Sequence, residues 1–156
     1  MSAYLPSMGP FAAFCFLGTA VTGVSRTKVV GGEAGQIVSH GEFVVVKLRT
    51  WFDPSTISPD RSNGPLTPNG REAILTDCKG REYLPSPRTT DVLEARQVHS
   101  TPLSTPLRPG ESYTSYVVFE VPARTQGLRL WVRSRADVGA SLWGNEQSPL
   151  HGKARF

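Results

Sequence analysis

Residues 42–52 have the sequence EFVVVKLRTWF, and this stretch decides the expected fold class. β-Branched and aromatic side chains dominate it, and both types favour extended backbone. From Val46 onward polar and apolar residues alternate, which places Val46 and Leu48 on one face and Lys47 and Arg49 on the other. The pattern predicts an antiparallel strand with one face on a core and one face in solvent.

Other segments of the chain carry the same signals. Leu128, Leu130 and Val132 are expected to point inward from one strand. A type I turn at Asp77–Gly80 is expected to join two strands into a hairpin. The further strands are expected at residues 27–30, 36–39, 72–76, 81–84, 112–121, 127–133 and 152–156. Only residues 91–98 look helical, with Thr90 or Asp91 as the cap.

These elements predict an all-β protein, specifically an immunoglobulin-like antiparallel β-sandwich with one short helix in a loop. A chain of 156 residues has room for one such domain. Two connections are long, at residues 53–70 and 85–106, and loops of this length are either functional or act as packed covers.

An apolar segment precedes the domain. Residues 1–25 contain no charged side chain, and an apolar run covers residues 11–21. Three interpretations stay open: an uncleaved membrane span over Ala3–Val24, a cleaved signal peptide, or a first buried strand or helix of the domain. The first two place the domain at residues 26–156 and outside the cytoplasm, and they predict contact with the membrane through the N-terminal segment.

Composition and motifs argue against most chemistry. The net charge of +4 comes from dispersed Lys and Arg residues, which argues against a nucleic-acid partner. His40, His99 and His151 lack the spacing of a metal site, and Ser141 lacks the context of a nucleophile elbow. We therefore predict no catalytic residue, no metal and no cofactor. Cys15 and Cys78 cannot form a disulfide within residues 26–156.

Four blocks occur in a familiar order: FVVVKL at 43–48, LTDCKGREY at 75–83, LRPGESY at 107–113 and FEVP at 119–122. In this respect the chain resembles a small family of exported immunoglobulin-like domains of unknown function over about residues 28–134. It is more distantly similar to the secreted mycobacterial antigen immunoglobulin-like superfamily. The resemblance implies an exported sandwich, often tethered by one N-terminal span or a lipid, and it carries no catalytic residues. The chain departs from it in the long connection at 53–70 and the uncharged N-terminus.

These inferences predict a non-enzymatic, extracytoplasmic envelope domain, membrane-anchored or secreted, that binds a protein or glycan partner through its loops. The alternative is a hydrolase or metal-dependent enzyme with its site in the long loops. The connection at 53–70 is the expected binding loop, since four prolines restrict its freedom and two aromatic residues precede it. A packed rim or a cover for the end of the sandwich is the alternative role. The candidate binding residues are Trp51, Phe52, Asp53, Asp60, Arg61 and Asn63.

Overall fold

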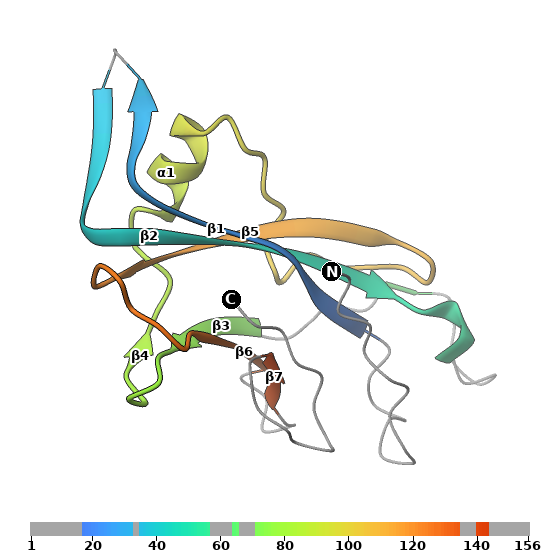
Figure 1. Cartoon of the computed structure of the whole chain (residues 1–156). Coiled ribbons are helices and arrows are strands. Elements are labelled where there is room, and N and C mark those ends of the chain that lie inside the picture. The colour runs from blue at the N-terminus through green and yellow to red at the C-terminus, as the bar shows by residue number, and fades with distance from the viewer. Residues whose placement is uncertain (1–16, 33–34, 57–63, 66–70, 135–139, 144–156) are drawn as a thin grey trace.

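The computed structural model describes residues 17–32, 35–56, 64–65, 71–134 and 140–143. Within these residues the chain forms two antiparallel sheets and one short α-helix (Figure 1). The elements are β1 (Leu17–Gly32), β2 (Gly35–Phe52), the 3-10 turn η2 (Pro54–Thr56), β3 (Arg71–Thr76), β4 (Glu82–Tyr83), α1 (Thr89–Ala95), β5 (Ser112–Val121), β6 (Arg129–Ser134) and β7 (Ala140–Trp143). The expected all-β class is confirmed.

The strands are divided between a three-stranded and a four-stranded sheet. The first has the order β1-β2-β5 and the second the order β4-β3-β6-β7. In the first sheet β2 lies in the middle, and its Trp51 is opposite Gly18 of β1 and Ser112 of β5. The long strand predicted around residues 43–51 is therefore the central strand of this sheet.

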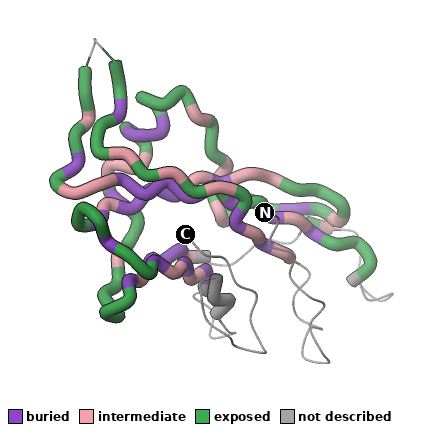
Figure 2. Tube along the Cα trace, viewed as in Figure 1, coloured by how far each residue is buried: buried purple, intermediate pink, exposed green. Residues whose placement is uncertain are grey.

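The two sheets share one hydrophobic core. Alternate residues of β2, such as Val44, Val46 and Leu48, are fully buried on its inner face. They belong to one cluster with residues of β3, β5 and β6, and Figure 2 shows these buried stretches on the facing sheets. The inward positions predicted for Leu128, Leu130 and Val132 are confirmed, since all three belong to this cluster.

A second cluster covers part of the opposite face of the first sheet. Phe43 and Val45 of β2 pack there with Val92 and Leu93 of α1. Residues 43–46 are therefore buried on both faces, and the half-solvated pattern was predicted only from Val46 onward. From Lys47 onward exposed and buried residues alternate as predicted, because α1 does not extend that far.

The helix begins earlier than expected and its predicted cap is wrong. Its N-cap residue is Arg88, which makes no side-chain capping bond, and Thr89 Oγ1 instead donates to Ser86 O at 2.6 Å. At the other end Gln97 has a φ of 56°, and the amide of Val98 donates to Leu93 O at 2.9 Å. This left-handed turn ends α1 and starts the segment that returns to β5.

The first strand crosses the boundary that was expected between residues 25 and 26. Residues 17–25 all lie in β1, and Thr19 and Val21 point into the core with exposed fractions of 4% and 9%. Alternation of small or polar residues with apolar ones fits an edge strand as well as an export signal. For this reason composition alone did not show that residues 17–25 belong to a strand of the domain. Residues 11–16 and the strand expected at 152–156 lie outside the described residues. No helix in the described part of the chain is long and apolar enough to cross a membrane.

The predicted hairpin is confirmed. β3 pairs with β4 through Leu75 and Tyr83, and the amide of Gly80 donates to Asp77 O at 3.0 Å across the turn. The strands predicted at 27–30 and 36–39 are the tip of one longer hairpin between β1 and β2. β7, which contains Ser141, was not predicted from the sequence.

Candidate functional site: an open face of the first sheet

The candidate residues of the predicted binding loop lie in different environments in the structure. Phe52 is only 1% exposed, and its backbone bonds to Glu111 and Gly110 hold the end of β2 against the turn before β5. It is a core residue rather than a surface anchor. Asp53 is exposed, and its Oδ1 accepts hydrogen bonds from Ser55 Oγ at 2.7 Å and Ser55 N at 2.9 Å, which lower the pKa of this carboxyl. Asp60, Arg61 and Asn63 lie outside the described residues.

Trp51 points to the outer face of the first sheet and lies over Gly18. A Cβ atom added at Gly18 would overlap indole carbons of Trp51 and lie 2.7 Å from its Nε1. The indole therefore occupies the space that a side chain at Gly18 would fill. Trp51 stays partly exposed, so its ring is available on the sheet surface as well as packed on it.

Beyond α1, the outer surface of the first sheet consists of three rows, each made of one residue from β1, one from β2 and one from β5 that lie opposite each other. In an antiparallel sheet directly opposite residues share a face. We use the name open face for the nine residues of these rows on the outer side: Gly18, Trp51 and Ser112; Ala20, Arg49 and Thr114; and Gly23, Lys47 and Tyr116. All of them are partly or fully exposed. The β1 side is low, because its three residues have small side chains or none.

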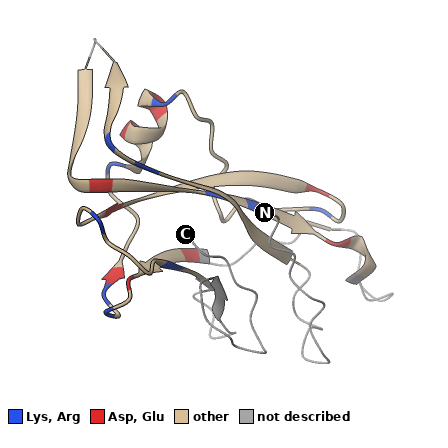
Figure 3. Cartoon of the chain, viewed as in Figure 1, with Lys and Arg blue, Asp and Glu red and all other residues tan. Residues whose placement is uncertain are grey.

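The open face is positively charged. Lys47 and Arg49 are both exposed, and the nine residues include no Asp or Glu. Within β2 and β5 the acidic residues are Glu42 and Glu120, at the far part of the sheet, and Figure 3 shows further acidic positions at the near end, where Asp53 follows β2 and Glu111 precedes β5. Lys47 Nζ lies 5.9 Å from the centre of the Tyr116 ring, a cation–π arrangement that holds the ammonium over the face. Among the described residues, neither cation has a carboxylate partner.

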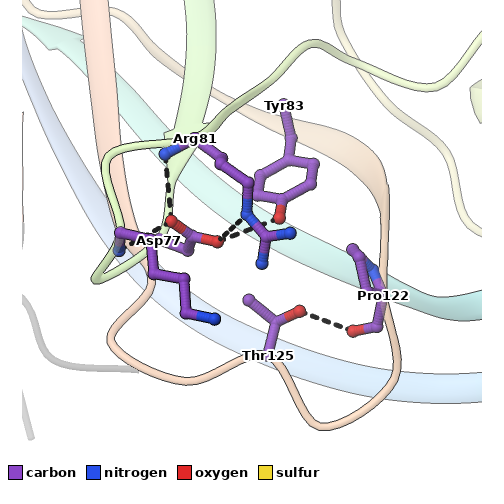
Figure 4. A network of polar contacts seen from close by, with 6 residues as sticks. Asp77, Arg81, Tyr83, Pro122 and Thr125 are labelled. Atoms are coloured by element: carbon purple, nitrogen blue, oxygen red, sulfur yellow. Dashed lines mark hydrogen bonds and ion pairs between the residues drawn. The ribbon is translucent and has the colours of Figure 1, made fainter.

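A second polar cluster lies at the hairpin between β3 and β4 (Figure 4). The Asp77 carboxylate is 3% exposed and accepts four hydrogen bonds: from Arg81 Nε at 2.7 Å, Lys79 N at 2.8 Å, Arg81 N at 3.0 Å and Tyr83 Oη at 3.0 Å. Burial raises the pKa of Asp77, but these hydrogen bonds outweigh it and bring the pKa to about 2.

This cluster is structural in character. Burial and the bond to Asp77 raise the pKa of Tyr83, so its hydroxyl stays a donor at neutral pH. The neighbouring loop between β5 and β6 is joined to the first sheet by Arg26, which donates to Thr125 O at 2.7 Å and to Glu42 Oε1 at 3.0 Å. The four hydrogen bonds of the Asp77 carboxylate are all made within the hairpin. The Arg26 contacts connect the adjacent loop to β2.

Groups that suit catalysis are not gathered in the described part of the chain. No hydrogen bond joins the described His40 or His99 side chains to a carboxylate or a hydroxyl there. Glu120 accepts bonds from Ser39 Oγ at 2.7 Å and His40 N at 2.9 Å, and the Ser39 bond is the main cause of its lowered pKa. Among the described residues no group of three or more metal-ligating side chains exists. His151 lies outside these residues.

Sequence reasoning found Trp51 but not the surface to which it belongs. The signal was present in part, because Lys47, Arg49 and Trp51 alternate with buried residues. Their neighbours Gly18 and Tyr116 are 33 residues before Trp51 and 69 residues after Lys47 in the sequence, and only the strand register brings them together.

Comparisons with known proteins concern the fold alone. The chain is similar to a conserved hypothetical protein from Bacillus anthracis known from its crystal structure, with a TM-score of 0.56 and 15% sequence identity. The similarity covers 80% of this chain and 85% of that one. No protein-family model matches the chain, and no curated protein matches it.

Proposed function

We propose that this protein is a non-enzymatic immunoglobulin-like domain that works outside the cytoplasm and binds a partner through the open face. The observation that carries the proposal is a broad, exposed sheet surface on which a tryptophan lies beside two cations that have no carboxylate partner among the described residues. A binding surface of this kind requires shape and charge, not a reactive group.

The order of the strands supports the immunoglobulin-like assignment. The sheets β1-β2-β5 and β4-β3-β6-β7 place β5, which follows a long crossover, beside β2, and place β6 beside β3. Immunoglobulin-like sandwiches have this alternation of strands between two sheets. The blocks that carry the family resemblance also have structural roles, since LTDCKGREY contains the Asp77 hairpin and LRPGESY the turn that holds Phe52.

Export is the second part of the proposal. The uncharged residues 1–25 support it, and because residues 17–25 belong to β1, a membrane anchor or a cleaved signal has to lie before this strand. The test is a fusion of the full chain to a reporter enzyme that is active only outside the cytoplasm. Reporter activity is the expected result, and an inactive but intact fusion would contradict export.

Site-specific photocrosslinking tests the binding surface. A photoreactive residue at Ser112 lies on the open face but leaves Lys47, Arg49 and Trp51 intact. The control places the photoreactive residue at the exposed Glu82 of β4, because β4 belongs to the other sheet. In the cells that make the protein, we expect an adduct from position 112 and none from position 82. Equal adducts at both positions, or none at 112, would refute binding through this face.

A further inference from the structure

We propose that the ligand of the open face is an acidic glycan, a polysaccharide that carries carboxylate or sulfate groups. This inference rests on the proposed function and names the chemical class of its partner. Three features of the open face support it: its charge, the position of its aromatic rings and the hydroxyl groups beside them.

Charge selects an anionic ligand. Lys47 and Arg49 project from neighbouring rows of β2, and the open face contains no carboxylate that would repel an anion or occupy the cations. Two residues apart on a strand, their Cα atoms are separated by about 6.6 Å. An anion bound between them would gain charge-assisted hydrogen bonds, and the planar guanidinium of Arg49 suits a carboxylate or a sulfate.

The other residues of the open face suit a sugar ring. The C–H face of a sugar is apolar and packs on an aromatic ring, and the Trp51 indole is held over Gly18 at one end of the face. The β5 side of the same rows supplies the hydroxyls of Ser112, Thr114 and Tyr116, which can exchange hydrogen bonds with sugar hydroxyls. The low β1 side, with Gly18, Ala20 and Gly23, lets an extended chain lie across the strands.

The same features argue against a nucleic acid. Non-specific binding to nucleic acid comes almost entirely from the phosphates that the protein neutralises, for example about 6–10 of them. The open face offers two cations, and this number also gives little attraction to an anionic membrane surface, at about 1 kcal/mol per basic residue. A glycan gains affinity from the aromatic ring and the hydroxyls in addition to the two charges.

The experiment measures binding of the full-length protein to polygalacturonate, heparin, dextran, single-stranded DNA and phosphatidylglycerol vesicles. Polygalacturonate and heparin test carboxylate and sulfate as the source of the charge, and dextran is the neutral sugar control. We expect retention by at least one acidic glycan, and a loss of about tenfold or more in affinity for the double variant K47Q/R49Q. Trp51→Ala is expected to weaken binding to the same glycan, with its melting temperature measured in parallel.

A matched control removes the same charge elsewhere. The double variant K79Q/R124Q changes two exposed cations on the hairpin and on the loop between β5 and β6, outside the open face. It is expected to bind as the unmodified protein does. Equal losses in both double variants would show that net charge alone attracts the glycan, and would overturn the proposal.

Other results of the binding experiment would also overturn the proposal. Binding to neither acidic glycan, unchanged binding by K47Q/R49Q, or tighter binding to DNA or to vesicles would each overturn the acidic glycan. The crosslinking at Ser112 is read separately. An adduct at Ser112 without glycan binding would refute only the ligand class, whereas the absence of an adduct would refute the binding function itself.

Discussion

Trp51 and Gly18 face each other across β2 and β1, and the indole of Trp51 covers the glycine. The position of the ring on the open face therefore depends on the absence of a side chain at residue 18. Glycine in a strand lowers its stability, so its presence here is consistent with close approach of another group.

Gly18→Ala is expected to displace the Trp51 indole, because the new Cβ would overlap it. One of the three tryptophan indole N–H resonances should shift in a two-dimensional NMR spectrum. Gly23→Ala is the control on the same strand, since a Cβ there would lie 3.6 Å from Lys47 Cβ, an ordinary contact. Unchanged indole resonances in Gly18→Ala would show that the ring does not lie over Gly18.

Gly41 is required for close packing of β2 against the end of β5. A Cβ at this position would overlap the carbonyl oxygen of Val121 and lie 2.9 Å from Pro122 Cα. Both are backbone atoms, so a side chain cannot simply rotate away. We expect Gly41→Ala to lower the free energy of unfolding by about 3 kcal/mol in urea titration. Gly35→Ala, where a Cβ meets nothing within 4 Å, should change it by less than about 0.5 kcal/mol. Equal effects of the two changes would contradict this packing.

Gln97 ends α1 in a conformation that favours glycine. Its φ of 56° places it in the left-handed region, where a residue other than glycine is disfavoured by about 1 kcal/mol. Gln97→Gly is therefore expected to raise the free energy of unfolding by up to about 1 kcal/mol, offset in part by the greater freedom of glycine in the unfolded chain. Thermal or urea unfolding measures the change, and a clear loss of stability would show that the helix does not end in this way.

The Asp77 cluster predicts a dependence of stability on acid. Its pKa falls from 3.8 to about 2 on folding, so the carboxylate stabilises the folded state fully above about pH 5. This contribution is lost as the pH falls from about 4 to about 2. Asp77→Asn is expected to unfold at lower urea concentration than the unmodified protein at pH 6.

At pH 2 the difference between the two proteins should have narrowed, because Asp77 is then almost fully protonated in the unfolded chain and about half protonated in the folded chain. Asp53 and Glu120, which also have lowered pKa values, are present in both proteins and cancel in the comparison. A difference that stays constant from pH 6 to pH 2 would contradict a charged Asp77 at the centre of the cluster.

The fold class was predictable because its signals are local. Alternation at residues 46–52, the Asp77–Gly80 turn and the apolar positions of β6 each depend on a few neighbouring residues, and each is found in the structure. The end of the apolar segment was harder to place. Thr19 and Val21 alternate with small residues, and only their pairing with β2 distinguishes a strand from a signal sequence.

The candidate site was less predictable, since it depends on register. Trp51 and Phe52 are neighbours in sequence, yet β-strand geometry sends one to the open face and the other into the core. Similarly, α1 covers the outer face at Phe43 and Val45 but leaves it free at Lys47. Neither the reach of the helix nor the pairing of Lys47 with Tyr116 can be derived from local sequence.

The most direct test of the account is NMR mapping of the ligand surface. Oligomers of galacturonate and of heparin are added in separate titrations to the ¹⁵N-labelled protein, and shifts are followed for backbone amides and for the Trp51 indole N–H. The account predicts that the changes concentrate at Lys47, Arg49, Thr114 and Tyr116 and at this indole, with the Asp77–Tyr83 hairpin unaffected. Changes centred on that hairpin, or no change with either oligomer at saturation, would contradict the claim that the open face binds an acidic glycan.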